Sequence, residues 1–170
     1  LQKLPKLRYL DLQRNQLNEV PRAIEKLYRI EELNLSGNPD IRLKNVCPQL
    51  LLMPKLKSLS LADNRLRRLP ADFSKLDYLE ELNLVYNQME EFPSQIIHLR
   101  RIKTLHIYGN RISHLPAEIG QMTSIESLYA SGNYIEVLPK EIGKWKNLKV
   151  LSLMDNGIRQ IPAEIGLLKK

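Results

Sequence analysis

The stretch LKSLSLADNRL, Leu56–Leu66, shows the pattern that decides the fold of this 170-residue chain. Its skeleton is L-x-x-L-x-L-x-x-N-x-L. Leu59 and Leu61 alternate with small or polar residues, which is the period-two pattern of a half-buried strand. Asn64 then predicts a turn, and Leu66 returns to the interior.

The same skeleton recurs along the whole chain, starting again at Leu7, Ile30, Leu79, Ile102, Ile125 and Leu148. All repeats are 23 residues long except the second, which gains three residues within Pro39–Asn45. A fixed period in this range is typical of a solenoid. We therefore predict one domain, 1–170, in which the tail of a preceding repeat is followed by seven repeats. The tail is 1–6 and the repeats are 7–29, 30–55, 56–78, 79–101, 102–124, 125–147 and 148–170.

Each repeat also has a second half that predicts a short helical return. An apolar residue and Pro are followed by apolar positions three residues apart, as in Leu69–Phe73 and Leu138–Ile142. This spacing favours one or two turns of 3₁₀ or α-helix, and Pro suits the start of such a turn. One unit cannot bury its apolar face alone, so stacking is expected to place the strands in one parallel sheet.

An asparagine recurs at the end of every predicted strand, forming a ladder of Asn15, Asn38, Asn64, Asn87, Asn110, Asn133 and Asn156. A carboxamide turned inward at a bend can donate to and accept from backbone groups that the sheet leaves unpaired. We interpret these asparagines as structural rather than as ligands for a bound molecule.

These repeats resemble the leucine-rich repeat family. The motif Leu/Ile-Pro-x-Glu-Ile-Gly at 115–120, 138–143 and 161–166 is similar to that of the family's 23-residue subclass. That subclass occurs in Ras-group intracellular scaffolds and in many bacterial leucine-rich repeat proteins. The resemblance implies an α/β fold, a curved right-handed solenoid with the sheet on its concave side, and protein binding as the usual activity. Flanking caps are absent from this sequence, so we expect it to be part of a longer chain.

The predicted concave face carries few charges and one group of large side chains. Residues 23 apart should stack in columns, and the first three columns hold only three charged residues, Asp11, Glu32 and Glu81. The large side chains on neighbouring rungs are Val85, Tyr86, His106, Tyr108, Tyr129, Tyr134 and Met154. Because Tyr and Met are enriched at protein interfaces, we predict a non-catalytic scaffold that binds a partner protein here. The alternative is that Tyr merely suits strands.

The net charge of +7 supports a different function as the alternative. Many cations fall at repeat boundaries on the return flank, including Lys26, Arg29, Lys55, Lys57, Arg100, Arg101, Lys103, Lys144, Lys146 and Lys149. Such a flank could bind an anionic partner, either nucleic acid or a membrane surface. Few aromatic residues lie among these cations, so solvated side chains are the favoured interpretation and nucleic acid is an unlikely partner. On the opposite edge, Arg67-Arg68 and Glu90-Glu91 predict a cross-rung ion-pair network.

The sequence offers weak support for catalysis or for metal binding. Glu81, His106 and Ser127 fall on successive rungs, which suggests a Ser-His-acid arrangement. No loop for an oxyanion hole accompanies them, and an open face does not exclude water. No ligand cluster predicts a metal, and no cofactor is expected. Cys47 is predicted to be a small apolar filler in the irregular second repeat.

The chain has no apolar run near the roughly 20 residues of a membrane span, and no signal peptide is recognisable. Its one cysteine rules out an internal disulfide. We therefore predict a cytoplasmic protein, without disulfide caps, that serves as an interaction scaffold in signalling.

Overall fold

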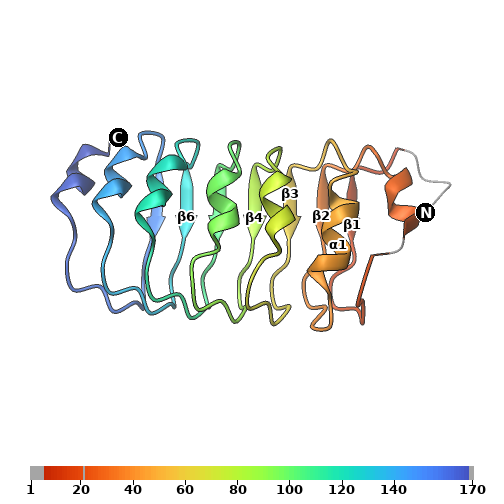
Figure 1. Ribbon diagram of the computed structural model, residues 1–170, viewed down its shortest axis with the longest axis horizontal. Coiled ribbons are helices and arrows are strands. Elements are labelled where there is room, and N and C mark those ends of the chain that lie inside the picture. Colours follow the sequence, from red (N-terminus) through yellow and green to blue (C-terminus); the bar gives the residue numbers. More distant parts are fainter. Residues whose placement is uncertain (1–5, 21, 169–170) are drawn as a thin grey trace.

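The computed structural model describes residues 6–20 and 22–168, which form a row of stacked rungs (Figure 1). All but Lys6 of the expected 1–6 tail, together with Pro21 and residues 169–170, lies outside the described residues. Each predicted repeat contributes one strand, and the strands pair in sequence order in a single parallel sheet. They are β1 (Tyr9–Asp11), β2 (Glu32–Asn34), β3 (Ser58–Ser60), β4 (Glu81–Asn83), β5 (Thr104–His106), β6 (Ser127–Tyr129) and β7 (Val150–Ser152).

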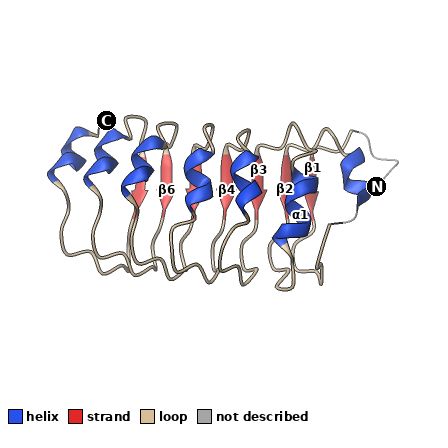
Figure 2. Ribbon diagram, in the orientation of Figure 1, coloured by secondary structure: helices blue, strands red, loops and turns tan. Residues whose placement is uncertain are grey.

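Six of the returns are 3₁₀ helices that cover one side of the sheet (Figure 2). They are η1 (Arg22–Lys26), η2 (Ala71–Lys75), η3 (Ser94–His98), η4 (Ala117–Gln121), η5 (Lys140–Lys144) and η6 (Ala163–Leu167). From η2 to η6 each helix begins directly after a proline. The fixed φ of Pro directs the chain into the first turn, and its missing N–H is one that a helix start leaves unbonded. The predicted alternation of strand and short return is confirmed.

The second repeat is different because its return is the α-helix α1 (Leu43–Leu50). The buried side chains of this helix are Leu43, Val46, Cys47 and Leu50. Their spacing of three, four and seven residues matches one face of an α-helix. Cys47 is a buried filler, as predicted, and burial raises the pKa of its thiol to about 11. The thiolate is therefore scarce at neutral pH.

Leucine and isoleucine side chains from all the rungs form one continuous core. The central strand residues Leu33, Leu59, Leu82, Leu105 and Leu128 pair in register and are buried. The strand residues on either side of them form columns from Tyr9 to Val150 and from Asp11 to Ser152. These are the two columns that the 23-residue spacing predicts. Trp145 and Phe73 are the largest fully buried side chains, and the Trp145 indole donates to the Ile119 carbonyl at 2.7 Å.

Candidate functional site

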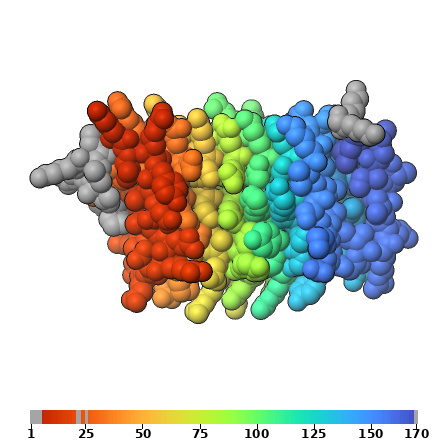
Figure 3. Space-filling view, turned by 180° about the vertical axis from the view of Figure 1, so that it is seen from behind, coloured from red at the N-terminus to blue at the C-terminus, as the bar shows by residue number. Residues whose placement is uncertain are grey.

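The face opposite the helices, here called the sheet face, is held in shape by the asparagine ladder. Figure 3 shows this side of the molecule, where successive rungs follow one another as bands. The Asn87 carboxamide donates to the carbonyls of Leu84 at 2.9 Å and of Leu61, one rung earlier, at 3.0 Å. Its oxygen accepts from the backbone N–H groups of Asn64 and Leu66 at 3.1 and 2.9 Å. Such bonds satisfy buried backbone groups and fix the position of one rung against the next.

The residue before each ladder asparagine has a left-handed backbone. The φ angles of this column lie between 51° and 67°. Its members are Arg14, Gly37, Asp63, Tyr86, Gly109, Gly132 and Asp155. For a residue with a side chain this conformation costs about 1–2 kcal/mol, so Gly and Asp suit the column and Tyr does not. The sequence analysis predicted a turn at the asparagine but not its left-handed backbone, although three glycines and two aspartates in one column were a signal for it.

Tyr86 is exposed, with 63% of its surface accessible, yet one face of its ring packs against the next rung. The ring lies over Gly109, where any Cβ atom would collide with it. It also meets the Tyr108 ring edge to face, with 5.2 Å between centroids and an interplanar angle of 85°. Glycine on the next rung therefore leaves the space that a tyrosine in a left-handed turn needs.

His106 and Tyr129 form a second aromatic pair beside the first. Their rings stack with centroids 4.6 Å apart and an interplanar angle of 6°. The His106 Nε2 atom lies 3.5 Å from the Glu81 Oε1 atom. Burial lowers the pKa of His106 below its ordinary value, although the Glu81 carboxylate opposes this shift. The imidazole is therefore mainly neutral at pH 7, and its contact with Glu81 is not a full ion pair.

The Ser-His-acid arrangement is only partly assembled. Ser127 pairs with Thr104 in the column of Glu81, whereas His106 belongs to the neighbouring column. Within the described part of the chain, no hydrogen bond joins the Ser127 hydroxyl to His106. The imidazole stacks on Tyr129 instead, so it is not placed to take a proton from this serine.

Four members of the predicted patch form the two aromatic pairs, two others are exposed, and one lies below the surface. Tyr134 and Met154 are 64% and 70% exposed, and His106, Tyr108 and Tyr129 are half-buried. The expectation that Val85 faces solvent is wrong, because only 3% of its surface is accessible. Ser36 in the same column is also buried, since this column borders the inward turn. We call the remaining residues the aromatic patch: Tyr86, His106, Tyr108, Tyr129, Tyr134 and Met154.

A column of alternating charge runs along the edge where the strands begin. Its members, here called the charge ladder, are Arg8, Glu31, Lys57, Glu80, Lys103, Glu126 and Lys149. Glu31 contacts Arg8 at 3.0 Å and Lys57 at 3.5 Å. Lys103 contacts Glu80, and Lys149 contacts Glu126, each at 2.6 Å. The hydrogen bonds from Lys103 and Lys149 lower the pKa values of Glu80 and Glu126.

The charge ladder weakens the alternative that the basic return flank binds an anionic partner. Lys57, Lys103 and Lys149 were assigned to that flank, but each of them lies against a glutamate. Their charges are therefore matched locally, which leaves less positive potential for an anionic partner. The alternation of positive and negative residues could be read from the sequence, because the repeat period places a glutamate next to each of these lysines in the column.

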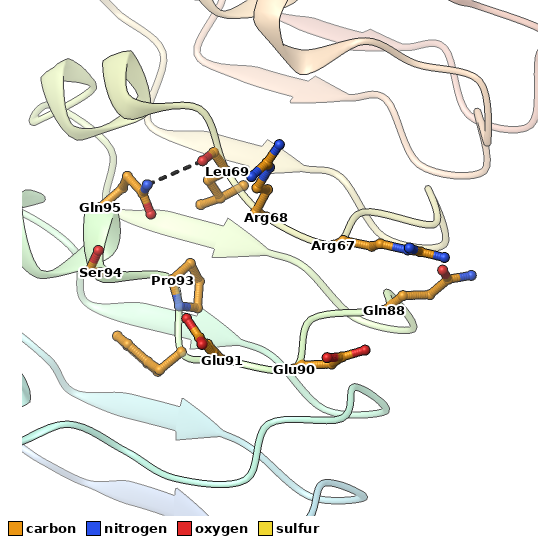
Figure 4. Close-up of a pocket in the computed structure, with 10 residues that line it drawn as sticks. Arg67, Arg68, Leu69, Gln88, Glu90, Glu91, Pro93, Ser94 and Gln95 are labelled. Carbon is orange, nitrogen blue, oxygen red and sulfur yellow. Dashed lines mark hydrogen bonds between the residues drawn. The ribbon is translucent and has the colours of Figure 1, made fainter.

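The predicted ion-pair network on the opposite edge is not formed. Arg67, Arg68, Glu90 and Glu91 line a groove of about 420 Å³, drawn in Figure 4. No ion pair joins these four side chains in the part of the chain that the structure describes. Figure 4 shows Arg68 pointing away from Glu91. Exposed pairs of this kind contribute only about 0–1 kcal/mol, too little to hold long side chains together across the groove.

Within residues 6–20 and 22–168, no group of three or more His, Cys, Asp or Glu side chains is placed to hold a metal ion. No helix in this part of the structure has both the length and the apolar character needed to cross a membrane.

Comparison with known protein families gives two matches that together cover residues 1–133. A family described as a leucine-rich repeat region matches residues 40–133, and one described as leucine rich repeat matches residues 1–39. No curated protein matches the chain.

Solved structures with the same architecture include proteins from bacteria and from a plant. An internalin C2 from Listeria monocytogenes is 27% identical, with a TM-score of 0.81 over 99% of this chain and 70% of its own. A leucine-rich repeat protein of Leptospira interrogans is 27% identical, with a TM-score of 0.66 over 98% of this chain and 54% of its own. The plant peptide hormone receptor RGFR1, solved in complex with RGF2, is 26% identical, with a TM-score of 0.74 over 98% of this chain and 28% of its own. This chain therefore spans about half the length, or less, of two of these three proteins.

Proposed function

Because the chain belongs to the leucine-rich repeat family, whose domains generally act as protein-interaction scaffolds, we propose that it binds another protein through its aromatic patch. The observation that carries this proposal is the set of large side chains held at the surface by a rigid framework. Tyr86, Tyr134 and Met154 are mostly exposed, while the asparagine ladder fixes the backbone beneath them. Such preorganised aromatic side chains lose little conformational freedom on binding.

The patch also offers hydrogen-bonding groups. Tyr9 and Tyr78 use their hydroxyl groups within the protein, on Asp11 and on the Leu50 carbonyl. In the described part of the chain, the four phenol groups of the patch form no such bond. A tyrosine with a packed ring and a free hydroxyl is suited to a protein interface, where one end is apolar and the other polar. The solved complex of a similar plant receptor with RGF2 adds support from the family.

The test is the double substitution Tyr108→Ala/Tyr129→Ala in the intact protein. A partner is first captured and identified, and its affinity is then measured by calorimetry with purified components. Because central aromatic residues often cost about 2 kcal/mol or more when truncated, we expect affinity to fall at least about 30-fold. Tyr9→Ala is the matched control, since Tyr9 is an exposed strand tyrosine on the first rung of the same face. Unchanged affinity in the double variant would refute the patch.

The alternative function, binding an anionic partner through the return flank, has less support. Three of its lysines are matched by glutamates in the charge ladder. Exposed cations such as Arg100, Arg101 and Lys144 remain on that flank. Binding of nucleic acid that weakens steeply with salt would favour this alternative over the patch.

We also propose that the domain is non-catalytic and acts as a scaffold in the cytoplasm, the role that the predicted resemblance to Ras-group proteins implies. The separation of Ser127 from His106 supports a non-catalytic role. The free, buried thiol of Cys47 is compatible with a reducing compartment.

A further inference from the structure

A second surface lies on the helical side of the molecule, between α1 and η2. It is a cleft of about 700 Å³. The cleft occurs where the α-helical return of the second repeat meets η2, the 3₁₀ return of the third repeat. The α-helix α1 and the 3₁₀ helix η2 differ in pitch and length, so their side chains cannot interlock along the whole length of both helices. This mismatch accounts for the space between them. We call this surface the basic cleft.

The floor of the basic cleft is apolar and recessed. Leu43, Cys47, Leu66 and Leu69 line it and are buried. Pro70 and Ala71 lie nearer the mouth, where Pro70 is half-buried and Ala71 is exposed. The volume and lining suit a side chain of a peptide, because aliphatic groups gain about 25 cal/mol per Å² of area buried.

The rim of the cleft is cationic and unmatched. Arg42, Lys44 and Arg68 line it and are exposed. Among the described residues, none of these three cations forms an ion pair. The one acid in the lining, Asp72, is engaged by Lys75 at 2.7 Å. The lysines of the charge ladder, in contrast, each contact a glutamate.

Two further features favour negative charge at this place. The first turn of α1 contains no acidic side chain, so the positive end of the helix dipole is not compensated from within the helix. Figure 4 shows the Arg68 guanidinium turned away from Glu90 and Glu91, the nearest acids on the following rung. Both features favour an anionic group at the mouth of the apolar cleft.

We propose that the basic cleft binds an acidic peptide segment of a partner protein, with one apolar side chain in the cleft and carboxylates on Arg42, Lys44 and Arg68. A nucleic acid fits less well, because no aromatic residue lines the cleft to stack on a base. A flat membrane surface could reach the rim but not the recessed leucines. The cleft is lined by residues of α1 and η2, which cover the helical side of the sheet (Figure 2). The aromatic patch belongs to the sheet face, so this proposal does not depend on the patch.

The probe is a fluorescein-labelled peptide in which one Leu is flanked on each side by Glu-Asp. The control peptide has Gln and Asn in place of the acids. Binding to the full chain is followed by fluorescence anisotropy at low and physiological salt. We expect saturable binding of the acidic peptide, weakened by salt, and no saturable binding of the amide peptide. Equal binding of both peptides would overturn the proposal.

Charge and shape can be tested separately with matched variants. Arg42→Glu/Arg68→Glu should weaken the acidic peptide about tenfold or more, since two attractive contacts become repulsive. Arg100→Glu/Arg101→Glu makes the same change in net charge elsewhere and should alter affinity by less than about twofold. Ala71→Phe should fill the cleft and reduce binding without changing charge. Ala117→Phe, at the first residue of η4, is its control.

The remaining outcomes also decide the question. Circular dichroism and urea unfolding must show that each variant is folded. Loss of peptide binding in Tyr108→Ala/Tyr129→Ala, but not in Ala71→Phe, would place the peptide on the aromatic patch and overturn the proposal. Tighter binding of single-stranded RNA or of phosphatidylserine vesicles, lost in Arg42→Glu/Arg68→Glu, would also overturn it and would identify the rim as a nucleic-acid or membrane site.

Discussion

Asn87 illustrates how much of the architecture depends on a single kind of side chain. Its carboxamide contacts backbone atoms of its own rung and of the preceding one. Asn110 and Asn133 repeat this arrangement on the next rungs. No aliphatic side chain of similar size can replace these bonds, because each carboxamide both donates and accepts.

Replacement of Asn87 by Ala should therefore be costly. The substitution leaves several buried backbone groups unpaired, and we expect the free energy of unfolding to fall by about 3 kcal/mol or more. Asn15→Ala is the control, because Asn15 is exposed on the first rung and, among the described residues, bonds only within its own turn. Urea denaturation measures both variants. A loss for Asn15→Ala as large as that for Asn87→Ala would contradict this account.

For side chains near the turn, the sequence was a poor guide to whether they lie at the surface or in the interior. Val85 was expected at the surface but is buried, because the strand has already begun to turn inward there. Tyr86 was correctly expected at the surface, but the sequence analysis did not predict its left-handed backbone or the packing of its ring over Gly109. Both features depend on the sign of a backbone angle that the leucine pattern does not encode.

At the level of elements, the charge ladder links neighbouring rungs where the strands begin. The backbone N–H of Lys103 donates to the Glu80 carbonyl at 2.8 Å, while its side chain contacts the Glu80 carboxylate at 2.6 Å. Glu126 and Lys149 repeat both contacts two rungs later. Like charges in this column would oppose one another along the whole edge, so the alternation favours the observed register.

Lys103→Glu should lower the midpoint of thermal unfolding, because it places a carboxylate between Glu80 and Glu126. The loss should shrink as salt is added, since these charges are exposed and are screened. Lys55→Glu, at an exposed position outside the ladder, should have a smaller effect with the same change in net charge. An equal loss in both variants at low salt would contradict the role of the ladder.

The charge ladder also predicts how stability depends on pH. The pKa values of Glu80 and Glu126 are lowered in the folded protein from an ordinary value of 4.5. Their contribution is therefore complete above that value and is lost as the pH falls through the lowered pKa values. The pKa of Lys103 is raised by Glu80, so its contribution is lost only as the pH rises beyond its ordinary value of 10.5. Urea unfolding of wild type and Glu80→Gln between pH 3 and 7 should converge at the acid end.

The regular returns were predictable because each depends on a local pattern of Pro followed by spaced apolar residues. The return of the second repeat was less clear from its sequence, since the usual Leu-Pro pair is missing there. The helical spacing of Leu43, Val46, Cys47 and Leu50 was nevertheless available as a signal for α1. The cleft beside η2 could not be foreseen, because it arises from how two different helices meet.

For the molecule as a whole, each rung packs mainly against its neighbours. Stability in such an array is close to a sum of nearest-neighbour terms. The central strand leucines Leu82, Leu105 and Leu128 are buried, whereas Leu10 and Leu151 on the outer described strands are only half-buried. The middle of the array should therefore be the last part to open.

Hydrogen exchange provides the measurement. Backbone amides in β4, β5 and β6 should exchange at least about tenfold more slowly than those in β1 and β7, because outer rungs open at lower free energy. Asn110→Ala, in the middle of the array, should narrow this difference. Uniform exchange across all seven strands would show that the rungs open as one cooperative unit.

The 23-residue period, the order of the strands and the columns of the sheet follow directly from the sequence, because they depend on which residues are apolar and how far apart they lie. Only the tertiary structure showed four other features. They are the burial of Val85, the packing of the Tyr86 ring over Gly109, the ion pair of Lys103 with Glu80, and the basic cleft. Each of them joins residues from different rungs, or depends on a turn and on side-chain directions. Spacing along the chain specifies which rungs are neighbours, but contact between their side chains depends on backbone angles and rotamers that arise when the rungs stack.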